Sequence, residues 1–352
     1  MKALGWAVAA VALGLAVLVV GLEVAGFDAE AGLSALWLGA FGSWDAITSS
    51  TLVRAVPLIL IGLGISVAFR GGALNIGAEG QFYAGAIAAT WVGLHLAGQP
   101  GPLAIGVLLL TAAVAGLCWV ALPVWLKLRF GVIEVISTLL LNFVALSLVS
   151  FMVQGPLQER GRIYPQSDAI AEAARLPLLP GSRLHGGLVL AVAGGLVLWF
   201  LFARTLWGFR LRAVGMGPRA AEVSGRIDSQ RVSAVAILIS GAIAGLAGGV
   251  EVSGVSYALF QNLSPGYGFT GIAVALLGGL HPIGVIVAGI LFGALEAGAG
   301  AMQREAGIPA VAVYVVEAVV IIVALLATAP RGGWTGLRAV VRKRIAPGKA
   351  AG

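Results

Sequence analysis

Residues 71–81 read Gly-Gly-Ala-Leu-Asn-Ile-Gly-Ala-Glu-Gly-Gln, and they interrupt a chain that otherwise consists largely of long apolar runs. Asn75, Glu79 and Gln81 are the polar residues of this segment, and they are interspersed with glycines. Hydrocarbon tolerates neither unpaired polar groups nor irregular backbone, so the segment must be buried in protein or line a water-filled cavity. The segment therefore predicts a membrane protein that moves a solute through itself.

Composition places the chain among polytopic membrane proteins. It has 352 residues, of which 59% are hydrophobic and 11% charged, and its mean hydropathy is +1.01. A soluble domain carries about a quarter charged residues. Glycine accounts for 52 residues, and Gly241, Gly245 and Gly249 fall four apart on one helix face. Small residues let membrane helices approach closely, which predicts a tightly packed all-α bundle.

Apolar runs of about 20 residues mark the expected membrane helices. We expect them near 3–22, 51–69, 82–97, 103–126, 132–153, 186–203, 232–254, 268–280, 282–300 and 309–329. The run at 268–280 is too short to cross alone, and the mixed stretch 26–48 is expected at the outer interface. The first run exceeds the core of a usual secretory signal, so we expect a retained helix there rather than a cleaved one.

Charge sets the expected orientation. Six arginines lie in 204–231, and the tail 331–352 carries six basic residues and no acidic one. Both segments should be cytoplasmic, whereas the mixed-charge connection 154–185 should be external. Ten crossings with both termini cytoplasmic satisfy these constraints, and eight or nine are the alternatives. We expect one transmembrane domain over 1–330, followed by the basic tail 331–352. The net charge of +7 follows from these loops, so we expect no nucleic-acid partner.

A second polar cluster lies in the run EVISTLLLN, residues 134–142. Glu134, Thr138 and Asn142 are spaced by four, so they form a polar stripe on one face of an apolar helix. Such a stripe should face the interior of the bundle, where it either lines a pathway or holds helices together by hydrogen bonds. Three further acids, Glu251, Glu296 and Glu317, lie within apolar runs; for Glu296 and Glu317 we favour an interface or packing role.

The basic segment 204–231 contains a helix start at Pro218, which follows Gly217. Residues 219–224 form a short amphipathic helix between membrane spans, of a kind that a partner protein could grip. The alternative is an ordinary cytoplasmic loop. The candidate docking residues are Gly215, Pro218, Arg219, Ala220, Ala221, Glu222, Ser224 and Gly225.

The chain lacks the sequence patterns of an enzyme. It contains no G-x-x-x-x-G-K-[ST] motif, so it does not bind and hydrolyse ATP through a P-loop. It also shows no catalytic triad, no metal-ligand cluster and no C-x-x-C pair. We therefore expect no catalytic residues, no metal and no cofactor.

Four runs in order, GGALNIGAEGQFYAGA, EVISTLLLN, GFRLRAVGMGPRAAEVSG and SGAIAGLAGGVE, resemble the permease subunits of bacterial ABC importers. The resemblance covers about residues 50–330 and is strongest to the nucleoside and simple-sugar branch, which is related to ribose and branched-chain amino acid permeases. It implies a type II importer fold and a second, often non-identical, permease subunit. It also implies an ATPase, frequently with tandem nucleotide-binding domains, and an extracytoplasmic solute-binding protein, often a lipoprotein. In such permeases a cytoplasmic coupling helix docks on the ATPase, and here it maps to 215–225.

The residues and the resemblance together predict half of a translocation path in the cytoplasmic membrane that opens alternately to either side. The side chains expected near the path are Asn75, Glu79, Gln81, Glu134, Thr138 and Asn142. Polar clusters without fixed cations suit an uncharged polar solute such as a nucleoside. The alternatives are a simple-sugar permease, an ion-coupled secondary transporter and a non-transporting membrane scaffold.

Overall fold

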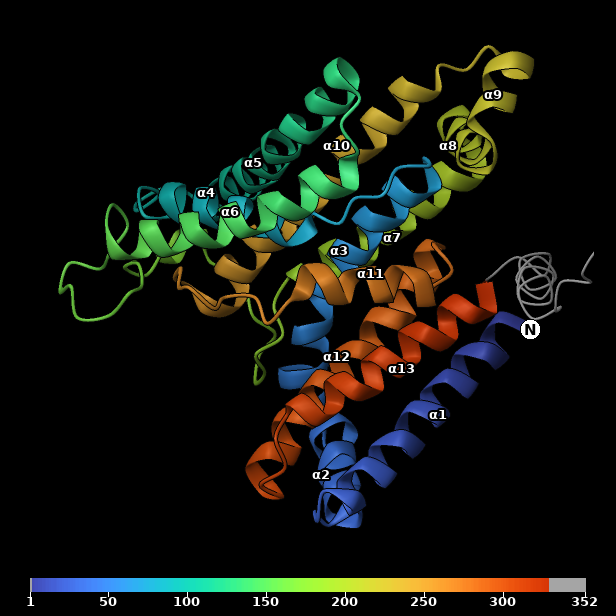
Figure 1. Ribbon diagram of the computed structural model, residues 1–352. Helices are drawn as coiled ribbons and strands as arrows, with labels where there is room; N and C mark the ends of the chain where they lie inside the picture. Colours follow the sequence, from blue (N-terminus) through green and yellow to red (C-terminus); the bar gives the residue numbers. More distant parts are fainter. Residues whose placement is uncertain (1, 329–352) are drawn as a thin grey trace, which may run out of the picture.

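A computed structural model describes residues 2–328, and its regular secondary structure consists of helices (Figure 1). The basic tail 331–352 lies outside the described residues. The helices are α1 (Lys2–Val24), α2 (Ala29–Phe41), η1 (Ala46–Thr51), α3 (Leu52–Arg70), α4 (Ala78–Gly93), α5 (Gly101–Phe130), α6 (Glu134–Gln154), η2 (Glu172–Ala174), α7 (Gly187–Arg204), α8 (Leu206–Met216), α9 (Pro218–Gly225), α10 (Ser229–Glu251), η3 (Val252–Ser256), α11 (Tyr267–Leu277), α12 (Pro282–Glu305) and α13 (Val311–Thr328). The all-helical class predicted from the apolar runs is confirmed.

Six helices of the described part are long and apolar enough to cross a membrane. They span Ala46–Arg70, Gly101–Phe130, Glu134–Gln154, Gly187–Arg204, Ser229–Ser256 and Pro282–Glu305. The first of these is the most enclosed, with 83% of its most apolar window buried, whereas α5, α6 and α7 are only 28% buried over theirs. Apolar side chains such as Phe143 and Val189 are exposed on these outer helices, as expected where a helix faces lipid.

Helices α3 and α10 form the centre of the bundle. Helix α10 packs against α3, α4 and α5, while α3 also packs against α11 and α12. Helices α1 and α13 lie side by side at one edge (Figure 1). The core is therefore made from the middle of the chain, and its two ends close the bundle on the outside.

Glycines allow the central helices to approach until their backbones touch. A Cβ added at Gly116 would overlap the Gly241 carbonyl oxygen and lie 2.7 Å from Gly245 Cα. A Cβ at Gly249 would lie 2.5 Å from Ala112 Cβ. The face that carries Gly241, Gly245 and Gly249 is thus turned toward α5, which confirms the close packing expected from their spacing.

The stretch 26–48 contains a helix that the sequence reading missed. Helix α2 begins after Asp28, whose Oδ1 accepts a hydrogen bond from the Ala31 backbone N–H at 3.0 Å. It packs against α12, where a Cβ at Gly298 would lie 2.6 Å from the Leu36 carbonyl oxygen. The scattered acids obscured this helix, because they lie at its start and in the turns around it rather than on its packed face.

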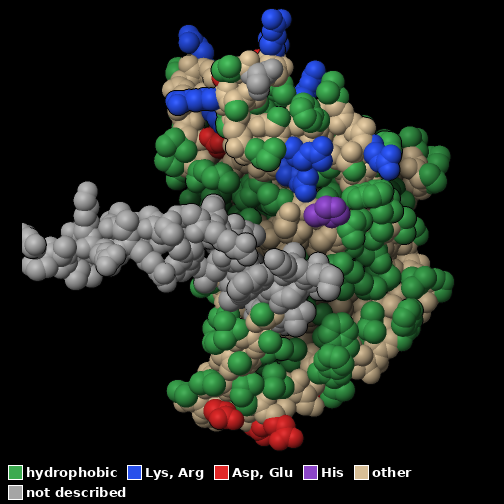
Figure 2. All heavy atoms as spheres, turned by 90° about the vertical axis from the view of Figure 1, so that its right-hand side faces the viewer, with side chains coloured by type: hydrophobic (Ala, Val, Ile, Leu, Met, Phe, Trp, Pro, Cys, Tyr) green, Lys and Arg blue, Asp and Glu red, His purple; other side chains and the backbone are tan. Residues whose placement is uncertain are grey.

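Basic side chains gather at the end of the bundle that carries α8 and α9. In Figure 1 the start of α1 and the helices α8 and α9 lie toward the right, and the long connection after α6 lies toward the left. Figure 2 views the right-hand side and shows Lys and Arg side chains gathered at the top, where α8 and α9 lie. Acidic side chains appear at the bottom of the same view, and a few also lie among the basic ones near the top.

The glycine contacts predict a position-specific effect on stability. Gly116→Ala should destabilise the protein by about 1–3 kcal/mol, because the new methyl group collides with the α10 backbone. Gly106→Ala on the same helix should be neutral or slightly stabilising, since nothing lies within 4 Å of the added Cβ. Thermal unfolding in detergent measures both variants. Equal midpoints for the two would contradict this packing.

Candidate functional site

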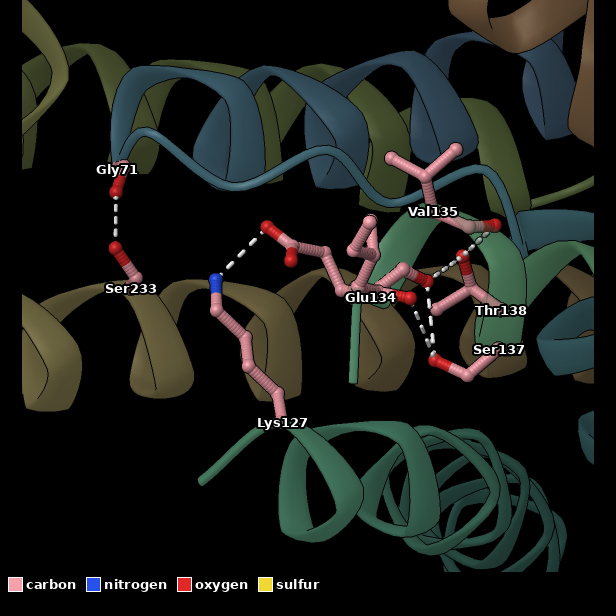
Figure 3. A network of polar contacts seen from close by, with 8 residues as sticks. Gly71, Lys127, Glu134, Val135, Ser137, Thr138 and Ser233 are labelled. Carbon is pink, nitrogen blue, oxygen red and sulfur yellow. Dashed lines mark hydrogen bonds and ion pairs between the residues drawn. The ribbon is translucent and has the colours of Figure 1, made fainter. Parts of the chain in front are cut away.

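The segment that joins α3 to α4 is the irregular core of the site. After Arg70 the chain turns at Gly72, where φ is +73°, and residues 73–77 run without helical structure to the start of α4 at Ala78. A backbone without helical hydrogen bonds needs other partners inside a membrane bundle. Ser233 Oγ on α10 donates to the Gly71 carbonyl oxygen at 2.7 Å, as Figure 3 shows. Neighbouring helices thus supply hydrogen bonds that this segment does not make within itself.

Asn75 and Gln81 form a reciprocal amide pair. Asn75 Nδ2 donates to Gln81 Oε1 and Gln81 Nε2 donates to Asn75 Oδ1, both at 2.9 Å. Asn75 Nδ2 also reaches Ser240 Oγ at 3.0 Å, and its Oδ1 accepts from the Gly77 N–H at 3.0 Å. Both side chains are buried. The pair closes the irregular segment onto the first turn of α4 and onto α10.

Asn142 binds the same segment from α6. Its Oδ1 accepts from the Gly80 N–H at 2.9 Å, and its Nδ2 donates to the Ile76 carbonyl oxygen at 2.9 Å. One side chain therefore satisfies a donor at the start of α4 and an acceptor in the segment before it. Of the two roles considered for the polar stripe, Asn142 clearly performs interhelical bonding.

The other two stripe residues have different surroundings. Thr138 is buried and donates to its own helix at the Glu134 carbonyl oxygen, at 2.7 Å, and its Cβ would lie 2.8 Å from a Cβ placed on Gly77. Glu134 begins α6 and accepts from Lys127 Nζ of α5 at 2.8 Å, an ion pair drawn in Figure 3. The stripe thus runs from an ion pair at the helix start to the buried amide of Asn142.

Glu79 connects two helix starts that are far apart in sequence. It lies in the first turn of α4, and its Oε2 accepts from the Gly268 N–H in the first turn of α11 at 2.6 Å. The contact requires glycine, because a Cβ at Gly268 would overlap the Glu79 backbone. A carboxylate is favourable at a helix N-terminus, where N–H groups lack helical partners. Glu79 therefore occupies the N-terminus of α11 and joins it to α4.

The structure thus brings Asn75, Glu79, Gln81, Thr138 and Asn142 to one junction, with Glu134 at the end of the same stripe. All of them except Glu134 are buried in the isolated chain. No group of three or more His, Cys, Asp or Glu side chains suited to a metal ion occurs in the described part of the chain.

The cytoplasmic candidate segment forms two helices. Helix α9 starts at Pro218, as expected, and ends at Gly225. Ala221 is only 5% exposed, and Glu222 Oε1 accepts a hydrogen bond from Ser229 Oγ, so these two residues hold α9 in place. A Cβ at Gly215 would overlap the Arg70 carbonyl oxygen, which seats α8 against the end of α3. The side chain of Ser224 lies outside the described residues.

Two apolar side chains on this surface were missed. Met216 is 86% exposed and Val223 is 87% exposed, on either side of α9's first turn. Large apolar side chains standing out among arginines mark a surface that another protein can cover. Their apolar character within a basic loop is the signal in the sequence that could have found them.

The long connection after α6 covers the opposite end of the bundle. Its backbone N–H groups at Ser167, Ile170 and Leu176 donate to the carbonyl oxygens of Leu259, Tyr257 and Ser253, each at 2.8 Å. His185 at its end is buried, and burial lowers its pKa to about 4, so the imidazole is neutral at neutral pH. This connection is therefore a packed cap on the end of α10 rather than a loose loop.

Comparison with known proteins identifies the family. The family described as branched-chain amino acid transport system, permease component, matches residues 47–325. The guanosine ABC transporter permease protein NupP of Bacillus subtilis is 38% identical over 89% of this chain and 90% of the relative. The glucose ABC transporter permease protein TsgB13 of Haloferax volcanii is 37% identical over 78% of this chain and 74% of the relative. The guanosine ABC transporter permease protein NupQ of B. subtilis is 31% identical over 70% and 79%.

No solved structure is significantly similar to this chain. The family match covers most of the sequence and includes α3 to α12, which carry the polar junction and the α8–α9 segment. The chain therefore belongs to the family of branched-chain amino acid transport system permease components, and is a multi-pass transport subunit of the cytoplasmic membrane.

Proposed function

We propose that this chain is the permease subunit of an ATP-driven importer that carries a nucleoside across the cytoplasmic membrane. The observation that supports this most is the 38% identity, over 89% of the chain, to a guanosine permease. A simple sugar is the second candidate, because a glucose permease is 37% identical. The relatives are named as ABC transporter permeases, which argues against the two alternatives of an ion-coupled transporter and a non-transporting scaffold.

We propose a topology of ten crossings over one permease domain, residues 1–330, with both termini in the cytoplasm. The six long helices supply part of this count, and α1 and α13 flank the bundle. Helices α4 and α11 are short, with 16 and 11 residues, and each crosses together with the non-helical segment before it. The arginine-rich α8–α9 side is then cytoplasmic and the packed cap after α6 is external.

We propose that an ATPase docks on α9, and the family resemblance implies that this ATPase carries tandem nucleotide-binding domains. Support comes from the exposed side chains Met216 and Val223 beside Arg219, and from the seating of α8 against Arg70. The second permease subunit would be a non-identical homologue, because NupP and NupQ are two guanosine permeases of one organism. An extracytoplasmic solute-binding protein would deliver the solute to the external side.

We propose that the polar junction borders the translocation path and determines its shape. Asn75, Gln81 and Asn142 hold the irregular segment 73–77 in place, while Glu79 fixes the start of α11 against α4. Thr138 and Glu134 extend the junction toward the cytoplasmic end of α6. Short helices that start inside a membrane bundle are a common feature of transport sites.

Transport itself provides the first test. The complete importer, oriented in proteoliposomes with its ATPase inside, should accumulate radiolabelled guanosine when ATP is enclosed in the vesicles. An ionophore should leave this uptake intact. Excess unlabelled glucose should not compete. Uptake of glucose in place of guanosine would favour the sugar alternative, and uptake abolished by the ionophore alone would overturn the ATP-driven mechanism.

The junction predicts a separation of stability from transport. Asn142→Ala should lower stability by about 1–3 kcal/mol, because it strands the Gly80 N–H and the Ile76 carbonyl. Glu79→Gln should preserve the fold, since an amide oxygen can still accept from Gly268, but should slow uptake. Ser147→Ala on the exposed face of α6 is the matched control. If both junction variants melted and transported like the wild type, the junction assignment would fail.

Docking predicts a loss of coupling at α9. Val223→Asp or Arg219→Glu should weaken ATPase binding by roughly 30-fold if either residue is a hot spot contributing about 2 kcal/mol. Solute-stimulated ATP turnover should fall while membrane insertion stays normal. Gln230→Glu at the exposed start of α10 serves as control. ATP turnover stimulated normally in both α9 variants would count against docking at this surface.

A further inference from the structure

A cavity with two charged side chains in a largely apolar wall lies among α3, α12 and α13, apart from the junction described above. Its volume is about 170 Å³, and its lining includes Arg54, Pro265, Glu296, Gly300 and Tyr314. Arg54 lies one turn after η1, and Ser49 of η1 accepts a hydrogen bond from the Arg183 N–H of the cap after α6. Ala310 in the α12–α13 turn completes the wall. The cavity is therefore at the capped end of the bundle, opposite α8 and α9.

Two side chains of opposite charge, Arg54 and Glu296, line this cavity, and further ionisable groups lie behind them. Arg54 interacts electrostatically with Glu251 of α10, which is only 6% exposed. Tyr267, at the start of α11, interacts electrostatically with the same charged groups, Arg54, Glu251 and Glu296. Ionisable side chains inside a membrane bundle are costly and mark functional sites by default. Here they come from three different helices, α3, α10 and α12.

The Nε–H donor of Arg54 has no hydrogen-bond acceptor in the described part of the protein. Within residues 2–328 its Nε is buried and makes no hydrogen bond. A buried guanidinium N–H without an acceptor is unfavourable unless a ligand or water completes it. Gly300 lines the space beside Arg54, and a Cβ there would lie 3.8 Å from Arg54 Nη2 and 3.2 Å from Arg304 Nη1. The cavity thus has a donor in need of an acceptor and room for one.

We infer that this cavity binds the base of the transported nucleoside, with Arg54 donating to a ring nitrogen or carbonyl oxygen and Glu296 accepting from ring or exocyclic N–H groups. Typical ligand pockets have volumes of about 300 Å³ or more, so this one suits a ring-sized part of a solute. A carboxylate with a guanidinium matches a base that carries donors beside acceptors. Tyr314, an exposed aromatic side chain, also lines the cavity. The inference rests on the proposed nucleoside transport and assigns its recognition residues.

Thiol labelling tests the cavity independently of transport rate. Cys118 is the single cysteine of the chain, so Cys118→Ser gives a background for Ala299→Cys in the cavity wall and Gln303→Cys outside it, on the same helix. In the assembled importer with its binding protein, guanosine should slow labelling at position 299 several-fold and leave position 303 unchanged. Equal labelling at position 299 with and without guanosine would overturn the inference.

Selectivity provides the second arm. Arg54→Gln and Glu296→Gln should each lower guanosine transport about tenfold or more, as expected for a lost charged hydrogen bond. Glu296→Gln should also narrow the preference for guanosine over inosine, which lacks the exocyclic amine. Glu305→Gln on the exposed end of α12 is the matched control, and Arg54→Lys retains the charge if Arg54→Gln does not assemble.

The outcomes separate the two proposals. A wild-type importer that takes up no nucleoside would overturn the proposed function. Normal guanosine uptake with unchanged rates and selectivity in the assembled Arg54 and Glu296 variants would overturn the cavity assignment alone.

Discussion

The structure depends on one constraint, which is that a non-helical backbone inside a membrane bundle must find every hydrogen-bond partner within the protein. In the segment 73–77, the Ile76 carbonyl accepts from Asn142 of α6 and the Gly77 N–H donates to the Asn75 side chain. Asn142 supplies a donor and an acceptor from α6, and Ser240 of α10 accepts from Asn75. These bonds fix the N-terminus of α4 inside the bundle. The short α11 is held beside it because Glu79 accepts from Gly268.

The same segment adjoins the surface assigned to the motor. Gly215 of α8 lies against the Arg70 carbonyl, and Ser233 at the start of α10 donates to the Gly71 carbonyl. Arg70 Nε also donates to the Leu280 carbonyl oxygen at 2.7 Å, which ties the end of α3 to the α11–α12 turn. A displacement of α9 and α8 would therefore act on the turn that precedes the polar junction. This continuity is spatial, and it gives a short route for coupling between the ATPase and the path.

Local patterns made much of this predictable. The apolar runs located the long helices, Pro218 located the start of α9, and the spacing of Glu134, Thr138 and Asn142 placed them on one face. Each of these signals lies within a few residues of the feature that it predicts. Helix α2 was missed because its acids lie at its start and in the flanking turns, so the stretch reads as mixed.

Features set by long-range contacts could not be predicted in this way. Glu79 bonds to a residue 189 positions away, and the burial of Ala221 depends on how α9 packs. No local pattern in the sequence singles out Arg54. Only the arrangement of α3, α10 and α12 brings it near Glu251 and Glu296, which themselves gave no sign of a shared partner.

The central claim is that reciprocal amide bonding closes the break before α4. A double-mutant cycle on Asn75→Ala and Gln81→Ala, followed by thermal unfolding in detergent, measures it most directly. Each single variant strands the amide of the other residue, so the account predicts that the double variant loses less stability than the sum of the two, with a coupling of about 0.6–1.7 kcal/mol. Strictly additive losses would contradict the account.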